Sequence, residues 1–347
     1  MPILPRNEFR RVVNMYRPDA RGEKLLSPAR CLGIFIGALS LCYVSWAYAA
    51  EYPIKTIQIV NPFPPGATTD IVSRLLTDKL HSLLGQQVVV VNKAGGGGAI
   101  GMKAVRDAAA DGYTILVAPP PLVQIPLARK DIGFTYRDFT PINLTAKVYF
   151  AMVVKKDAPW KSLEEIIAEA KSNPGKLSWG TAGSGTSHHF TLELFKILTG
   201  AEFTHVPLGG ETPMVTAILG GHISTAFVTL GTVTPHLQAG TLRGLALTSP
   251  NRLTEFPEVP TTAEKTYPTL NPQAWIIFLV PAKTPQAVVK RLGEAWRDAL
   301  RDREVIAKLE KAGFIIENLS SEETGHFLAE EHKKWSEVAR VAKITPQ

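Results

Sequence analysis

The chain has 347 residues, which is long for one hydrophobic core and predicts two domains. Hydrophobic residues make up 45% and charged residues 20%, which is typical of a globular protein and excludes a disordered or fibrous chain. The formal net charge is +7, but residues 1–50 carry +4 of it and the rest only +3. A basic surface for nucleic acid is therefore not predicted.

The first fifty residues have the three parts of a secretory signal peptide. Arginines and lysines from Arg10 to Arg30 form a basic region, and residues 31–46 form an uncharged apolar run shorter than the ~20 residues of a bilayer span. Small residues precede a cleavage site after Ala49. We predict that residues 1–49 are a cleaved signal peptide and that the mature protein is periplasmic. An uncleaved anchor and a start at Met15 remain alternatives.

Both cysteines, Cys31 and Cys42, lie in this leader. The mature chain therefore has no thiol for a disulfide, a catalytic thiolate or a cysteine zinc site. No later segment reaches ~18 consecutive apolar residues, so no further membrane span is predicted.

Strand and helix patterns alternate after the leader. Helical spacing of Ile71, Leu75, Leu76 and Leu80 predicts a helix that opens at Thr69-Asp70. The βαβ order predicts a mainly parallel sheet with helices on both faces. The predicted strands are 56–60, 87–91 and 113–118, and the next helix is near 102–110.

A second α/β unit begins at the strand 150–154, and Ser162 with Glu165 predicts a capping box for its first helix. A late strand at 275–280 returns to the first unit. The predicted strands between are 177–179, 203–206, 224–228 and 243–247, the helices are 163–171, 190–198 and 213–219, and the tail holds two helices, around 285–301 and 321–340.

This order predicts an α/β protein of two lobes. Residues 50–150 and 273–347 form lobe 1 in this interpretation, and residues 151–272 form lobe 2. Ligands of open α/β sheets bind at the carboxyl ends of strands. A cleft between the lobes would place strand-end loops of both around one ligand.

The first candidate loop, residues 61–70, joins a strand to a helix. Backbone N–H groups and the helix dipole favour an anion there, and Thr68 and Thr69 add hydroxyl donors. Asp70 has two interpretations, as the helix N-cap or as a direct ligand contact, and the N-cap is favoured.

The second candidate loop, residues 181–189, combines glycines, hydroxyls and two histidines. A Ser-His nucleophile is disfavoured because the spacing around Ser184 is not G-x-S-x-G and no acidic residue is evidently tied to either histidine. His188 and His189 are poor metal ligands together, because adjacent helix positions point to different faces.

Gly96, Gly98 and Gly101 match the dinucleotide-binding pattern G-x-G-x-x-G between a strand and a helix. The acidic residue that should follow the next strand is missing, because that strand ends in three prolines. These glycines are therefore interpreted as a tight turn.

Taken together, motifs along the mature chain resemble the Bug receptor family, the substrate-binding proteins of tripartite tricarboxylate transporters. The resemblance covers residues 51–345 and depends on the order and spacing of several modest motifs. They are YPIKTIQIVNPFPPGATTDIVSR (52–74), GQQVVVVNKAGGGGAIG (85–101), DGYTIL (111–116), GTAGSGTSHHF (180–190), HVPLGGETP (205–213), LGGHI (219–223), PHLQAGTLRGLALTS (235–249) and PEVPTTAE (257–264).

The resemblance implies a type II periplasmic-binding fold that closes on a small carboxylate ligand, with no cofactor and no catalytic or metal site. It implies that loops 65–70 and 184–187 hold the carboxylate, partly through water. Its expected partners are membrane subunits of the transporter or, alternatively, a signalling protein, and the receptor itself is expected to be a monomer. The predicted ligand-binding residues are Phe63, Pro65, Gly66, Ala67, Thr68, Thr69, Asp70, Pro120, Ser184, Gly185, Thr186, Ser187, His188 and Thr229.

The chain departs from the family pattern at several positions. Leu208-Gly209-Gly210 replaces Tyr-Lys-Gly, Val228-Thr229 replaces an Asp after the strand, and three prolines from Pro119 replace a polar loop. All these changes remove polarity. We therefore hypothesise a ligand less polar than a di- or tricarboxylate, such as an aromatic or monocarboxylic acid. An enzyme is the least favoured class, because the loops show no acid–base pair.

Overall fold

A computed structural model describes residues 52–265 and 267–344. The predicted signal peptide and its cleavage site lie outside the described residues. These described residues form one compact unit. No helix among the described residues is long and apolar enough to cross a membrane.

The first α/β unit has the predicted parallel strands. β1 pairs in parallel with β2 on one side and with β3 on the other. Helix α3 buries Val72, Leu76 and Leu80, whereas Ile71 is 39% exposed, so the predicted apolar face was wrong at that residue. The elements are β1 (Ile57–Asn61), α3 (Thr68–Leu84), β2 (Val88–Asn92), a 3-10 turn (Gly96–Gly98), α4 (Ala99–Arg106) and β3 (Thr114–Ala118).

Helix α5 (Pro121–Ala128) was not predicted. Prolines at its start masked it in the sequence, although proline is well tolerated in the first helical turn, where the missing N–H has no intrahelical partner anyway. A further proline, Pro126, lies inside the helix. Its residues 121–125 are buried, so tertiary packing outweighs the poor helix propensity.

The strand β4 (Phe139–Lys155) is far longer than the predicted segment 150–154. Its first part pairs antiparallel with β9 (Gln273–Pro281) and β10 (Ile315–Leu319). Its last part pairs antiparallel with β7 (Ala226–Thr229) and β8 (Leu242–Leu247). β9 also pairs with β3, which joins β4 to the parallel strands. One strand thus runs through both halves of the fold. At Phe150 the partner of β4 changes from β9 to β7. The lobe boundary near residue 150 stays a prediction.

The second unit follows the predicted alternation of strands and helices. Ser162 caps α6 by accepting from the Glu165 N–H, but the Glu165 carboxylate accepts from the Lys161 N–H, so the capping box is only half formed. Helix α9 was not predicted. The elements are α6 (Leu163–Ser172), β5 (Ser178–Thr181), α7 (Ser187–Thr199), β6 (Thr204–Pro207), α8 (Glu211–Leu219), β7 (Ala226–Thr229), α9 (Leu230–Gln238) and β8 (Leu242–Leu247).

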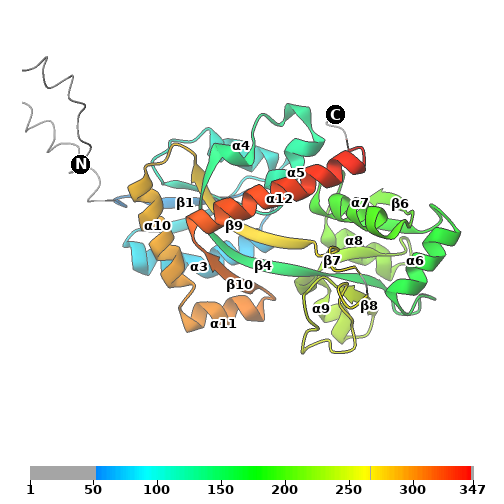
Figure 1. The fold of residues 1–347 in the computed structure, drawn as a ribbon. Helices are drawn as coiled ribbons and strands as arrows, with labels where there is room; N and C mark the ends of the chain where they lie inside the picture. Colours follow the sequence, from blue (N-terminus) through cyan, green and yellow to red (C-terminus); the bar gives the residue numbers. More distant parts are fainter. Residues whose placement is uncertain (1–51, 266, 345–347) are drawn as a thin grey trace, which may run out of the picture. The chain divides into compact units, whose positions relative to one another are not determined.

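The tail holds one more helix and one more strand than predicted. Helix α11 (Arg303–Lys311) and strand β10 lie between the two predicted helices, α10 (Gln286–Ala299) and α12 (Ser321–Val341). Figure 1 shows α12 running past α5 and α7, so one helix packs on elements from both units.

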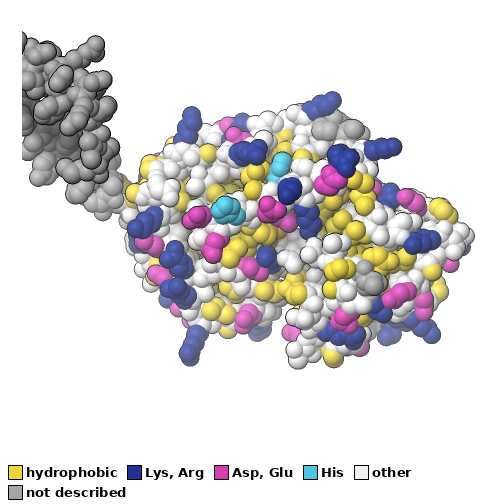
Figure 2. Space-filling model, viewed as in Figure 1, with side chains coloured by type: hydrophobic (Ala, Val, Ile, Leu, Met, Phe, Trp, Pro, Cys, Tyr) yellow, Lys and Arg dark blue, Asp and Glu magenta, His cyan; other side chains and the backbone are white. Residues whose placement is uncertain are grey.

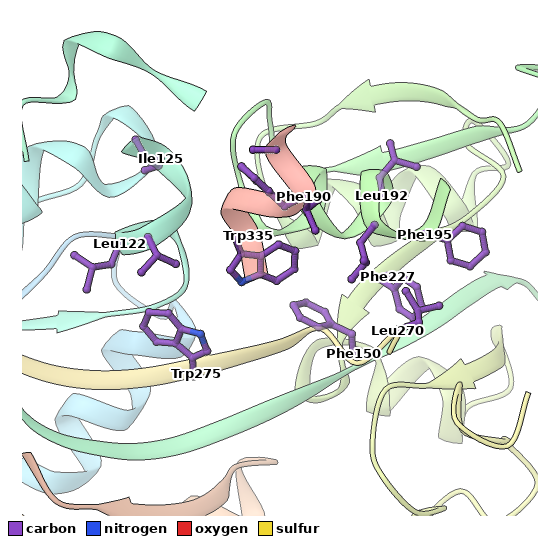
Figure 3. Close-up of a cluster of buried hydrophobic side chains, with 14 of the residues drawn as sticks. Leu122, Ile125, Phe150, Phe190, Leu192, Phe195, Phe227, Leu270, Trp275 and Trp335 are labelled. Atoms are coloured by element: carbon purple, nitrogen blue, oxygen red, sulfur yellow. The ribbon is translucent and has the colours of Figure 1, made fainter. Parts of the chain in front are cut away.

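A cluster of buried aromatic and aliphatic side chains joins the two units where α12 crosses them. The indole of Trp335 on α12 meets the Phe190 ring of α7 edge to face, with ring centroids 5.8 Å apart. The indole N–H groups of Trp275 and Trp335 both donate to the Glu331 carboxylate at 2.9 Å. Figure 3 shows side chains from α5, β4, β9, α7 and α12 converging there. Trp275 and Trp335 are both fully buried and act as packing residues.

Candidate functional site

The first loop is shaped by its own side chains. The Asn61 and Asn92 amides, at the ends of β1 and β2, each donate to the Phe63 carbonyl at 3.1 Å. The buried Thr69 hydroxyl donates to Asn61 Oδ1 at 2.6 Å. These bonds fix the path of the chain from β1 into α3.

Asp70 is not the N-cap of α3, because Ala67 occupies that position and gives no side-chain cap. The Asp70 carboxylate lies in the first helical turn and accepts from the Gly66 N–H at 2.9 Å. It also accepts two bonds from the Arg74 guanidinium and one from the Asn92 amide. Burial raises the pKa of Asp70, but these bonds outweigh it and lower the pKa from 3.8 to about 2. Asp70 therefore holds the loop as an anion.

The glycine run beside this loop forms a tight turn, as predicted. Gly95 to Gly98 all have positive φ, a region that side chains disfavour. At Gly101 a Cβ would lie 2.7 Å from Pro62 Cα, so only glycine allows α4 to approach the first loop this closely. These glycines therefore serve the turn and the close packing of α4.

The second loop is shorter than predicted, because α7 already begins at Ser187. Ser187, His188 and His189 therefore lie in its first turn. The N-cap residue Thr186 gives no side-chain cap, since its hydroxyl donates instead to the Gly183 carbonyl at 2.6 Å. The first turns of α3 and α7 both begin without a side-chain acceptor for their N–H groups.

Helix α5 brings the first unit against the second loop. The Ser187 hydroxyl donates to Gln124 Oε1 at 2.8 Å, and a Cβ on Gly185 would lie only 3.2 Å from the Ala128 Cβ. Gln124 is fully buried, and its Nε2 has no hydrogen-bond partner within residues 52–265 and 267–344. Pro120, a predicted site residue, is the buried N-cap of this helix.

His188 is tied to an acidic residue, contrary to the sequence interpretation. Its Nε2 lies 2.9 Å from Glu211 Oε1, and its ring meets Phe150 edge to face with centroids 5.6 Å apart. Because a carboxylate only accepts hydrogen bonds, Nε2 is the protonated nitrogen. Glu211 also accepts from the Thr229 N–H and from the Thr229 and Thr232 hydroxyls. The predicted residues His188 and Thr229 are thus joined through Glu211.

His189 faces away from Glu211, as its position next to His188 predicts, and its Nδ1 accepts from the Gly185 N–H at 3.2 Å. Its ring stacks on His205 with centroids 4.7 Å apart, and His205 Nε2 lies 2.6 Å from the Thr181 hydroxyl. Burial lowers the pKa of both histidines; Lys196 adds to the effect at His189, and His189 adds to it at His205. No cluster of three or more metal-ligating side chains occurs in the described part of the chain.

The predicted residues therefore fall into two groups. The first surrounds the start of α3, where Phe63 packs on the glycine run, Gly66 is exposed and Thr69 is buried. The second surrounds the start of α7, where Ser184 is exposed and Gly185 is buried against α5. Thr229 belongs to the second group through Glu211. Whether these residues contact a ligand stays a prediction.

Four residues that shape this region were missed. Arg74 and Asn92 had detectable signals, because one lies four residues after Asp70 on a helix and the other ends the strand beside β1. Gln124 and Glu211 had none, since their partners lie 63 and 23 residues away along the chain.

A surface cavity of about 200 Å³ lies elsewhere, near the start of β5. It contains none of the predicted site residues and lies at the opposite end of β5 from the second loop. Its lining residues are Lys155, Asp157, Ala158, Trp160, Ser178, Gly221, Ile223 and Ser224. Figure 2 shows basic and acidic side chains interspersed on the visible face, which does not form a one-sign patch.

Comparison with known proteins defines the class. The chain matches the tripartite tricarboxylate transporter family receptor over residues 72–343. It is 33% identical over 312 residues to Protein BugT of Bordetella pertussis, covering 89% of this chain and 95% of that protein.

Two solved structures with named ligands are also similar. One is Rpa4515 of R. palustris with adipate, with a TM-score of 0.78, 30% identity, and coverage of 86% of this chain and 100% of that chain. The other is MatC of Rhodopseudomonas palustris with bound malate, with a TM-score of 0.74, 27% identity, and coverage of 83% and 99%.

The fold is therefore that of a two-lobe periplasmic binding protein. The chain belongs to the tripartite tricarboxylate transporter receptor family. This is a family of periplasmic solute receptors, so the protein is a receptor and not an enzyme.

Proposed function

We propose that this receptor binds a small carboxylate between loops 63–70 and 181–188 and delivers it to the membrane subunits of a tripartite transporter. The observation that carries the proposal is the pair of helix starts without side-chain caps, at α3 and α7. N–H groups in a first helical turn need an acceptor from outside the helix, and the helix dipole favours an anion there. The adipate and malate of the two similar structures are carboxylates as well.

Around these helix starts, hydroxyls and backbone N–H groups supply further uncharged donors. Thr68 of the first loop is half-buried, and Ser184 of the second loop is exposed. The Asp70 carboxylate is already fully used by Gly66, Arg74 and Asn92. It therefore shapes the loop rather than facing the ligand, and we propose it as a positioning residue.

The remaining predictions complete the proposal. The signal peptide is cleaved after Ala49, and residues 50–150 with 273–347 move as one lobe against residues 151–272. β4 pairs with strands of both units, and α5 and α12 both contact α7, so these elements would connect the lobes.

A thermal-shift screen of mono-, di- and tricarboxylates tests the proposal. A ligand that binds only the folded protein at a hundred times its Kd adds about 2.7 kcal/mol to the unfolding free energy and raises Tm. Calorimetry then compares the wild type with Thr68→Val and Ser184→Ala, which we expect to weaken binding several-fold. Ser82→Ala, on an exposed part of α3, is the matched control. If no carboxylate raises Tm, the proposal fails.

A further inference from the structure

The Glu211 carboxylate fills an anion site inside lobe 2. Glu211 Oε1 accepts from His188 Nε2 at 2.9 Å and from the Thr229 N–H at 3.0 Å. Glu211 Oε2 accepts from the hydroxyls of Thr229 and Thr232, the latter at 2.7 Å. These four bonds use about all the acceptor positions of a carboxylate.

The donors around Glu211 are of a kind that can also bind an acid group of a ligand. Thr229 is the N-cap of α9, so its N–H lies at the positive end of that helix. Burial raises the pKa of Glu211, but the bonds from His188, Thr229 and Thr232 outweigh it and lower the pKa below its usual value. Glu211 thus remains charged, and the anion position at α9 is taken by the protein itself.

This cluster lies at the same edge as the second loop. β5 and β6 are parallel neighbours, and a parallel bridge joins Trp179 of β5 to Thr225 just before β7. The three strands therefore end together, and α7, α8 and α9 follow them with His188, Glu211 and Thr229 in or beside their first turns. Ser187, next to His188, bonds to Gln124 of the other unit.

The structure leads to a different interpretation of Val228-Thr229 at this edge of the sheet. Val228-Thr229 replaces an acidic residue of the family pattern, which suggested a loss of charge. Glu211 brings a carboxylate to Thr229 from a different helix. Apolar side chains lie beside this polar cluster, with Phe150 against His188 and Leu230 directly after Thr229.

We propose that Glu211 restricts the ligand to acids with one carboxylate, held at the α3 and α7 helix starts, with an apolar remainder toward Glu211. The inference rests on the proposed carboxylate site. A second carboxylate in the ligand would meet a like charge in a partly dehydrated site and would find the lobe 2 donors already in use. We expect each diacid to bind at least about tenfold more weakly than the matched monoacid.

Calorimetry on protein purified after expression of the full chain tests this with matched pairs, hexanoate against adipate and benzoate against terephthalate. The wider carboxylate screen supplies further ligands. Tightest binding by monoacids supports the inference. Equal or tighter binding of a di- or tricarboxylate overturns it and leaves the proposed carboxylate site intact. If no acid binds at all, the proposed function fails and the inference with it.

The variant Glu211→Gln then tests the residue itself. It removes the charge at nearly constant size, so we expect the preference for monoacids to shrink at least several-fold. Glu202→Gln, on an exposed carboxylate of the same unit, should keep the wild-type preference. An unchanged preference in Glu211→Gln overturns the inference. If that variant does not fold, the comparison of matched mono- and diacids on the wild-type protein still tests the inference.

Discussion

The two loops at the helix starts are alike in topology and differ in how they are held. Each joins a parallel strand to a helix without a side-chain cap. The first is held from within, because Asp70 binds Gly66, Arg74 and Asn92 at its own end of the sheet. The second has internal bonds from Thr186 to Gly183 and from Gly185 to His189, but it is held from outside as well. Ser187 binds Gln124 of the other unit, and His188 binds Glu211 of another helix.

The difference shows two ways to stabilise a loop that must keep backbone N–H groups available. A loop held by its own ion network keeps its shape whatever the other unit does. A loop held by distant partners changes when those partners move. We therefore expect lobe movement to alter the second loop more than the first, and the following predictions test this comparison.

The largest effect is expected for Asp70→Ala. The change removes a buried carboxylate and leaves the Gly66 N–H and the Asn92 amide without their charged acceptor. Urea unfolding should show a loss of about 2–3 kcal/mol. Asp107→Asn, at an exposed carboxylate paired with Arg106, should lose much less, because water screens that ion pair. Similar losses in both variants would show that Asp70 does not hold the first loop.

The same carboxylate gives the first loop a pH dependence. The folded pKa of about 2 lies below the unfolded value of 3.8, so the stabilisation is complete above about pH 4 and is lost as the pH falls toward 2. The free energy of unfolding should fall by about 2 kcal/mol over this pH range. Unfolding measured from pH 5 to 2 should show the wild type converging on Asp70→Asn. Parallel curves for the two proteins would contradict it.

A smaller effect is expected where the two units touch. Ser187→Ala removes the bond to Gln124 and leaves both ends of that buried amide unpartnered among the described residues. The cost should be about 1–2 kcal/mol. Gln124→Leu in the Ser187→Ala background should recover part of it, because it removes the unpartnered amide. Urea unfolding of the single and double variants measures the coupling, and Ser172→Ala, at an exposed position, is the control. If the stability losses of the two single variants simply add in the double variant, the contact between Ser187 and Gln124 does not stabilise the protein.

The smallest effect concerns the stacked histidines behind the second loop. Their folded pKa values lie below 6.5, so the neutral pair contributes stability above that pH and loses it as the pH falls. His189→Phe keeps an aromatic ring on His205 and cannot titrate. Between pH 7 and 5 the wild type should lose slightly more stability than this variant, while exposed His81→Gln should follow the wild type. A steeper loss in His189→Phe would contradict the assignment.

Local signals sufficed for much of the fold. Alternating buried strands and amphipathic helices located β1, β2, β3 and most later elements, because their periodicity does not depend on distant partners. Helix α5 and the first part of β4 escaped, since prolines hid one and a mixed pattern hid the other. There, burial against other elements decides the structure.

The candidate site divides in the same way. Loops 63–70 and 181–188 were recognisable because glycines, prolines and hydroxyls between a strand and a helix indicate an anion site without further context. Asp70 was predicted to be the N-cap of α3, which was wrong. It lies three residues after the N-cap residue Ala67, in the first helical turn. Its true partners could be guessed only in part, from Arg74 four residues later.

The sequence by itself indicated the class of protein through its resemblance to a known family. It also located the two strand-to-helix loops and the tight glycine turn, because these depend on short-range backbone and side-chain preferences. Only the tertiary structure decided that Gln124 meets Ser187 and that Glu211 takes the anion position beside Thr229. Hydrogen bonds between residues distant in the chain leave no periodic trace in a sequence. Such bonds form only once the fold has brought the partners together, as it brings the starts of α7, α8 and α9 to one edge of the sheet.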